Sequence, residues 1–287
     1  MIKRFFAYYK PHMRLFVIDM ICALVVAACN LFFPFVTGNI IRDYIPNRRM
    51  DLVLLWCAVL LFVYVLKAFL TYVIQYWGHI MGVRIQGDMR KDFFHHVEQL
   101  PFSYFDDNKT GTIMSRIVND LFEISELAHH GPEDLFLSGV TLVGALVLIA
   151  VINPWLAVII AAIVPFMCWF AVVQRRKQKA AFARMREETG EINAEVESAV
   201  SGIRVAKAYT AGEHELARFD VANCNYQKAR GRAYKSMGVF NSGMGLFTDV
   251  LYLVALLAGG IFLYYDKIDA GQFATYILYV AMITSPI

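Results

Sequence analysis

The chain has 287 residues, of which 58% are hydrophobic and 18% are charged, and its mean hydropathy is +0.49. Soluble domains of this length do not carry so apolar a composition, so the sequence excludes that class and predicts an integral membrane protein. Basic residues that face anionic lipid are sufficient to explain the net charge of +3. We therefore expect membrane lipid, and no nucleic acid, among its partners.

The first 14 residues mix cationic and aromatic side chains, which predicts an amphipathic elbow segment lying on a basic, cytoplasmic membrane surface. Six apolar runs follow, so residues 15–287 predict an all-α membrane domain with six transmembrane helices. The runs cover about residues 15–36, 52–77, 135–152, 155–173, 239–264 and 273–287.

The connections between these runs alternate in length. The first, third and fifth have about 15, 2 and 8 residues, whereas the second and fourth have about 57 and 65, so both long connections fall on one side. Lys and Arg number 4 in the N-terminal segment, 5 and 13 in the long connections, and 3, 0 and 1 in the short ones. The positive-inside rule then predicts a multi-pass protein of the plasma (cytoplasmic) membrane, with its N-terminus and both long connections in the cytoplasm.

The long connections are predicted to be helices that leave the membrane without stopping. Residues 52–100 contain no proline and would form a helix of about 70 Å, against a hydrocarbon core of about 30 Å. Residues 166–209 show the same pattern, with basic residues at the water line and mixed charge beyond it. The turns are expected near residues 101–111 and 209–214, where exposed aromatic residues indicate contact with a partner.

Several short motifs occur in register with these spans. They are Pro34 to Pro46 (PFVTGNIIRDYIP), Leu100-Pro101 with Phe105-Asp106, Gly111, Ser115-Arg116 and Asn119-Asp120, the GIRVAKAY stretch of residues 202–209 with Glu213 and Arg218-Phe219, and Gly271-Gln272-Phe273 with Pro286. Over essentially the whole chain, these motifs resemble the transmembrane domain of an ABC exporter.

The resemblance implies a half-transporter that pairs with a second half, identical or different. It implies export of a lipophilic or amphipathic substrate from the cytoplasm by alternating access, driven by ATP hydrolysis. It also implies two short coupling helices, at about residues 104–111 and 210–218, of which the first contacts mainly the chain's own nucleotide-binding domain and the second the partner's. The residues assigned to them are Tyr104, Phe105, Asp106 and Gly111 in the first, and Tyr209, Thr210, Gly212, Glu213 and Arg218 in the second.

The chain departs from the family pattern at its end. It has no GxxxxGK[ST] phosphate loop and no LSGGQ-like stretch, so we expect no ATP hydrolysis by this chain alone. ATP and Mg²⁺ are expected in a nucleotide-binding domain supplied in cis or in trans. The sixth run has only about 15 of the roughly 20 residues that a span needs, which predicts a truncated chain or fragment.

Charges inside spans cost at least about 2.5–3.5 kcal/mol, so they mark candidate positions on a transport path. Lys67 lies midway along the second predicted span and Asp249 midway along the fifth. We predict that both face a cavity at the dimer interface, where they contact substrate or pair across the two chains. Phe240 and Phe247 on the fifth span are aromatic candidates for the same path, and Asn30, Gln75 and His79 are weaker ones.

Neither a metal site nor a catalytic residue is predicted. The His95-His96 and His129-His130 pairs diverge by about 100° on a helix and lack an HExxH spacing. The alternatives to an exporter domain are a six-span secondary transporter or channel, and a membrane scaffold without an ATPase partner. Isolated charges and unbroken spans argue against a secondary transporter, and a scaffold would need no cavity.

Overall fold

The structure, a computed structural model, describes residues 2–284 of the chain, and side chains from Arg4 to Thr284. The described residues are almost entirely helical and contain no strand. They form two compact units, residues 2–157 with 257–284, and residues 158–256. This confirms the prediction of an all-α membrane domain.

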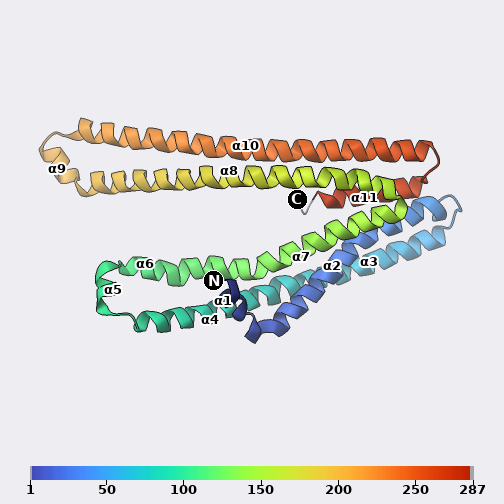
Figure 1. The fold of residues 1–287 in the computed structure, drawn as a ribbon, viewed down its shortest axis with the longest axis horizontal. Coiled ribbons are helices and arrows are strands. Elements are labelled where there is room, and N and C mark those ends of the chain that lie inside the picture. Colours follow the sequence, from blue (N-terminus) through green and yellow to red (C-terminus); the bar gives the residue numbers. More distant parts are fainter. Residues whose placement is uncertain (1, 285–287) are drawn as a thin grey trace. The chain divides into compact units, whose positions relative to one another are not determined.

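Five helical stretches in the described part are long and apolar enough to cross a membrane. The sixth apolar run forms a helix of 14 residues, and the end of the predicted run, residues 285–287, lies outside the described residues. The main helices are α2 (Met13–Asn39), α3 (Met50–Val73), α4 (His79–Glu98), α7 (Leu121–Ile152), α8 (Pro154–Ser201), α10 (Gly212–Tyr264) and α11 (Ala270–Ile283) (Figure 1).

The first unit carries one projecting helical hairpin. We call it arm 1; it extends from the start of α4 to the first turns of α7. Helix α3 continues through a π-helical turn at Ile74–Gly78 into α4, so Met50–Glu98 is one helical stretch of 49 residues, as the sequence predicted. At 1.5 Å per residue it is about 70 Å long. The chain returns through α5 (Phe102–Asp107), α6 (Thr110–Ser115) and a second π-helical turn at Arg116–Asp120 into α7 (Figure 1).

The second unit carries the other hairpin, arm 2, formed by α8 and α10 with the short helix α9 (Ile203–Ala208) at its tip (Figure 1). The prediction that the helix of the fourth apolar run continues unbroken beyond that run is confirmed, because α8 extends through the charged stretch to Ser201. Arg218 on α10 reaches Glu195 on α8 at 3.0 Å. This ion pair joins the two helices near the tip.

The tip of arm 1 differs from the predicted coupling helix at residues 104–111. The short helix begins at Phe102, directly after Pro101, and ends at Asp107, because Asn108 and Lys109 adopt extended backbone conformations. Gly111 was assigned to this coupling helix, but it lies in the first turn of α6. Proline favours the start of a helix, because its fixed φ is already helical.

The tip of arm 2 also differs from its prediction. No separate short helix covers residues 210–218; the short helix is α9, and α10 already begins at Gly212. Gly202 interrupts the run at the end of α8, and Thr210 reverses the chain with a φ of 53°, in the left-handed region. The predicted helix at residues 210–218 therefore begins too late, because the short helix α9 comes before the turn at Thr210.

Helices α2 and α11 cross closely because glycine occupies the contact. A methyl group at Gly38 would overlap the Thr275 hydroxyl, and one at Gly271 would overlap the Gly38 carbonyl and the Arg42 side chain. Close packing through small residues is the usual way in which membrane helices associate. The Gly38 and Gly271 motifs noted in the sequence therefore have a packing role.

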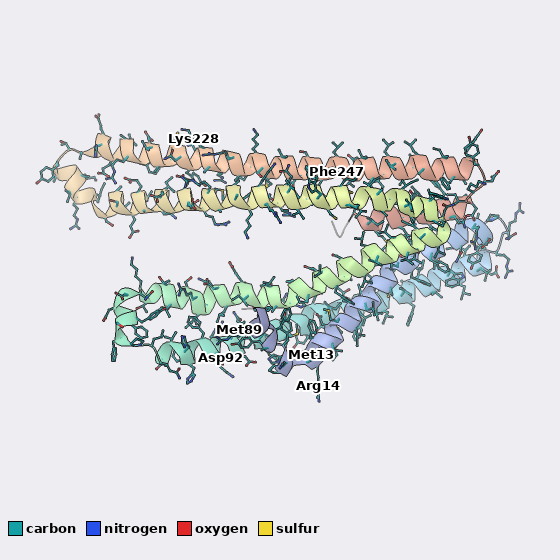
Figure 2. All side chains as sticks on the ribbon, viewed as in Figure 1. Met13, Arg14, Met89, Asp92, Lys228 and Phe247 are labelled. Carbon is teal, nitrogen blue, oxygen red and sulfur yellow. The ribbon has the colours of Figure 1, made fainter. Side chains whose placement is uncertain are left out.

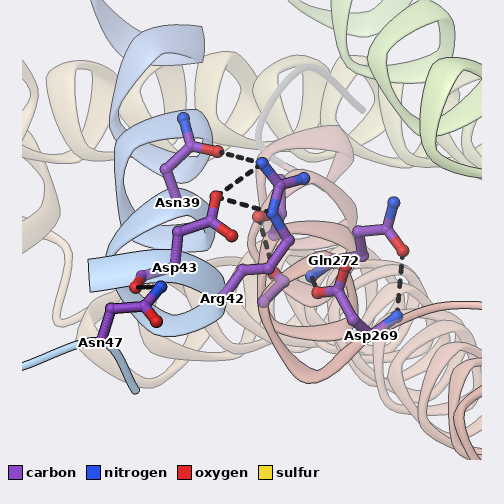
Figure 3. A network of polar contacts seen from close by, with 8 residues as sticks. Asn39, Arg42, Asp43, Asn47, Asp269 and Gln272 are labelled. Atoms are coloured by element: carbon purple, nitrogen blue, oxygen red, sulfur yellow. Dashed lines mark hydrogen bonds and ion pairs between the residues drawn. The ribbon is translucent and has the colours of Figure 1, made fainter. Parts of the chain in front are cut away.

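Polar contacts lie where α2 ends and where α11 begins (Figure 3). Arg42 Nη2 donates to Asp43 at 2.8 Å and to the Asn39 side chain at 3.3 Å. The Asp269 carboxylate accepts from the Gln272 backbone N–H at 2.8 Å, while the Gln272 side chain accepts from the Asp269 N–H at 2.9 Å. This reciprocal capping box fixes the first residue of α11.

The N-terminal segment packs against arm 1. It consists of α1 (Ile2–Ala7) and a 3₁₀ turn at Lys10–His12. Tyr8 donates to Asp92 on α4 at 2.7 Å, and His12 contacts Asp88 on the same helix at 2.9 Å (Figure 2 labels Asp92). The elbow is thus attached to the arm; its contact with a membrane surface stays a prediction.

Tyr9 in this segment forms a hydrogen bond with α7 at the place where Pro132 interrupts its helical bonding. Pro132 has no N–H, so the Ala128 carbonyl four residues earlier loses its usual helical donor. The buried Tyr9 hydroxyl donates to that carbonyl at 2.6 Å, and its ring packs with Met81, Ile85 and Ala128. The hydroxyl supplies the hydrogen bond that proline removed.

We predict that Tyr9→Phe lowers the free energy of unfolding by about 1–2 kcal/mol, because it leaves the buried carbonyl unpaired. In a Pro132→Ala background the same change should cost almost nothing, since the new Ala N–H would bond the carbonyl. Thermal unfolding in detergent over this double-mutant cycle measures the coupling. Tyr8→Phe, which loses an exposed bond, is the control, and an equal cost of Tyr9→Phe in both backgrounds would contradict the assignment.

Candidate transport site

Lys67 lines a cavity of about 520 Å³ within the first unit. The cavity lies between α2, α3, α7 and α11, and its walls are mainly apolar with a few polar groups. Among them are Asn30, Tyr64, Lys67 and Thr141. Lys67 is half-buried, and no carboxylate of the described residues lies within ion-pair distance of it.

The chemistry of this cavity suits a ligand with an apolar body and an anionic group. Its volume falls in the range of small-molecule sites, about 300–1,000 Å³. A lysine ammonium without a carboxylate partner attracts a negative charge, and in a partly dehydrated site that attraction is stronger than in water. Asn30, a weaker candidate in the sequence, lies in the same cavity, so the structure brings these two predicted residues together.

The other candidates of the transport path have different surroundings. Asp249 is exposed on α10 in the second unit, outside the unit that holds Lys67. Phe240 is 9% exposed and lies beneath the Arg175 guanidinium, at 4.3 Å from the ring centroid. The Phe247 ring lies 5.2 Å from that of Phe170 on α8 (Figure 2 labels Phe247). In this conformation both aromatic residues join α10 to α8.

Gly243 lies between these two aromatic contacts on α10. A methyl group there would overlap the Phe170 ring, so the glycine lets the ring approach the helix backbone. The Phe240–Arg175 and Phe247–Phe170 pairs therefore connect α10 to α8 at two places in the second unit. That Phe240 and Phe247 contact substrate stays a prediction.

The tips of the arms expose aromatic side chains. Phe102 on α5 is 90% exposed, compared with 42% for Phe105, and Tyr209 is 79% exposed. Tyr104 is half-buried, its ring lies perpendicular to Phe105, and its carbonyl accepts from Asn108 Nδ2 at 2.8 Å. Phe102 was not among the residues predicted for the first coupling helix, although its place directly after a proline, a residue common at helix starts, was a usable signal.

The remaining residues assigned to the tips are polar and mostly exposed. Asp106 lies in the last turn of α5, and Gly212 and Glu213 begin α10. The Thr210 hydroxyl donates to the Tyr209 carbonyl at 2.7 Å, which supports the left-handed turn there. Arg218 is held by Glu195, so it stabilises the arm rather than lying free at the tip.

Comparison with known proteins gives a consistent family assignment. A family model described as the ABC transporter transmembrane region matches residues 16–287. The chain is 36% identical to YwjA of Bacillus subtilis (strain 168), an ABC transporter ATP-binding protein, over 287 residues. It is 24% identical over 295 residues to an ATP-dependent lipid A-core flippase of Syntrophus aciditrophicus, and 26% identical over 216 residues to one of Thiobacillus denitrificans.

These alignments cover 100%, 99% and 75% of this chain, but 50%, 47% and 37% of the relatives. The chain thus spans about half the length of the relatives or less, and the part that it matches is membrane-spanning. The family match covers the five long helices, α11 and both arms. The resemblance drawn from the sequence motifs is confirmed, and this chain belongs to the ABC transporter transmembrane region family.

Proposed function

We propose that this chain is the transmembrane domain of a half-transporter. The transporter would move a lipophilic or amphipathic substrate out of the cytoplasm by alternating access. ATP hydrolysis in a nucleotide-binding domain outside these 287 residues, in cis or in trans, would drive the movement, with ATP and Mg²⁺ bound there. The chain itself has no phosphate loop to hold a triphosphate, so we assign it no nucleotide chemistry. Its contribution is to bind the substrate and to transmit motion.

The observation that carries this proposal is the continuity of the helices from spans into arms. The helical stretch Met50–Glu98 has 49 residues, α8 has 48 and α10 has 53, whereas a span needs about 20. A continuous helix is stiff, so a displacement at the tip moves the transmembrane end as well. A channel or secondary transporter needs no such lever.

The exposed aromatics at the tips support docking onto a nucleotide-binding domain. Phe102 and Tyr209 are large apolar side chains that water alone would not favour at the end of a polar arm. Aromatic anchors of this kind provide much of the free energy of protein interfaces. We propose that arm 1 contacts mainly its own nucleotide-binding domain and arm 2 that of a second half-transporter, identical or different.

The charge distribution supports a proposed orientation. The N-terminal segment and the two long connections of the sequence carry 22 of the 27 Lys and Arg residues, which favours the cytoplasmic side of a plasma membrane for them. The spans would then open their cavity alternately to each side. The nature of the cavity at Lys67 favours an amphipathic anion, and two relatives are named as lipid A-core flippases.

We predict that Phe102→Ala and Tyr209→Ala each reduce substrate export per ATP hydrolysed by about ten-fold or more. The reason is that loss of a docking anchor costs about 2 kcal/mol or more. Export and ATPase activity would be measured together in proteoliposomes of the transporter. Phe94→Ala, which removes an aromatic residue that is 55% exposed along the side of α4, is the control and should change neither. Full coupling in both tip variants would refute the docking role.

We predict that Lys67→Met weakens stimulation of ATPase activity by an anionic amphiphile about ten-fold in apparent affinity. The lost charge-assisted contact is worth about 1.5–3 kcal/mol. Stimulation by a neutral amphiphile should change little. The matched control is Lys228→Met on the exposed face of arm 2 (Figure 2), and Asp249→Asn tests the second predicted charge. Equal losses for neutral and anionic compounds would argue against a charge contact at Lys67.

A further inference from the structure

A group of buried ionisable side chains gathers where arm 1 leaves the transmembrane part of the first unit. Asp19 on α2 is 2% exposed, and His129 and Glu133 on α7 are 2% and 6% exposed. His79, the first residue of α4, and His130 on α7 lie beside them. Figure 1 shows α2, α4 and α7 coming together in this part of the unit.

The three side chains of this cluster surround a common point. Asp19 Oδ2 lies 3.7 Å from His129 Nδ1 and Glu133 Oε2 lies 3.4 Å from His129 Nε2, so the carboxylates approach opposite nitrogens of the ring, of which one ion would bind a single one. One ligand atom from each of the three residues lies within 4.8 Å of the others. Ligand atoms of a tetrahedral Zn²⁺ ion, at about 2.0–2.2 Å from the metal, are about 3.3–3.6 Å apart.

The polar atoms of the cluster lack hydrogen-bond partners among the described residues. These atoms are both carboxylate oxygens of Asp19, Oε2 of Glu133, both ring nitrogens of His129 and Nδ1 of His79. Two buried carboxylates without donors cost several kcal/mol each, and a neutral imidazole cannot balance two negative charges. A divalent cation would neutralise both carboxylates and use the free lone pairs.

The backbone around the cluster is shaped to admit the His129 ring. A methyl group at Gly78 would overlap this ring, and one at Gly82 would press on the Ser125 carbonyl. The glycine pair therefore brings α4 and α7 close enough for His79 to reach His129, with ring centroids 4.7 Å apart. A π-helical turn, a feature frequent at functional sites, ends at Gly78.

We propose that Asp19, His129 and Glu133 bind one divalent transition-metal ion, with Zn²⁺ as the best match. Imidazole and carboxylate together favour zinc and its neighbours over Mg²⁺ or Ca²⁺, which prefer oxygen ligands alone. A second set, His79 with His129 and His130, shares His129, and His130 Nδ1 lies 3.9 Å from Glu133 Oε2. We place the ion at the carboxylate set because only there does it offset buried negative charge.

The i, i+4 spacing puts His129 and Glu133 on one face of α7, so a single helix supplies two ligands. Asp19 then ties α2 to that face. The ion would join α2 to α7 beside the start of α4, at the base of arm 1. This inference does not depend on export, because metal binding is measured without substrate or ATP.

The test uses Zn²⁺ itself as the probe, by equilibrium dialysis and elemental analysis of the purified transporter in nanodiscs. We expect about one tightly bound Zn²⁺ per chain, and an affinity reduced by about ten-fold or more in the Asp19→Asn/Glu133→Gln variant. The control variant, His95→Gln/His96→Gln, removes two exposed histidines of α4 and should bind as the wild type does. Equal binding by the wild type and the Asp19→Asn/Glu133→Gln variant would overturn the site.

A second measurement keeps the proposal testable if the variant folds poorly. Thermal unfolding of the wild-type transporter is followed with a chelator and then with excess Zn²⁺. A ligand that binds only the folded state at 100 times its Kd stabilises by about 2.7 kcal/mol, so the Tm should fall with chelator and recover with Zn²⁺. The same recovery is expected in the His95→Gln/His96→Gln control. An unchanged wild-type Tm would overturn the proposal.

Discussion

Every backbone polar group in a lipid bilayer has to find its hydrogen bond inside the protein, and the helices of this chain follow from that constraint. Where proline removes a donor, a hydroxyl from elsewhere in the chain replaces it, as Tyr9 does at the Ala128 carbonyl. The Tyr279 hydroxyl of α11 also donates to a carbonyl of α2, that of Leu31, at 3.0 Å. The interruption at Pro132 is thus a point at which a distant segment is attached.

Glycine positions decide how closely these helices pack. Apolar side chains gain little by leaving lipid for one another, so contact depends on surfaces that fit. Gly38 and Gly271 let α2 meet α11, Gly78 and Gly82 let α4 meet α7, and Gly243 receives the Phe170 ring within the second unit. Each contact involves a side chain that would be displaced by a methyl group.

The charged groups of the first unit divide into two kinds, with different consequences for function. Lys67 faces a cavity with room for a ligand, which suits transient binding. Asp19 and Glu133 are enclosed with a histidine between them, which suits a permanent structural ion. An ion at the base of arm 1 would hold α2 against α7, so that motion of the arm would move these helices together.

The sequence alone determined the class of fold and the family. Apolar runs and the absence of proline in residues 52–100 depend on local composition and periodicity, so the membrane helices and their extensions were predictable. The order of the short motifs was enough to indicate the family. Helix ends at the tips were less predictable, because Asn108 takes an extended conformation that any residue adopts, and Thr210 takes a left-handed one that β-branched residues rarely adopt.

Only the tertiary structure decided which side chains meet. Asp19, His79 and His129 are far apart in the chain, and each histidine pair viewed alone on its own helix predicted no site. The sequence also did not predict that Tyr9 would meet the carbonyl that Pro132 leaves without a helical donor. Nor did it predict that four helices would surround the cavity that Lys67 lines. Sequence periodicity describes one helix at a time, whereas these contacts depend on how closely separate helices approach and at what rotation.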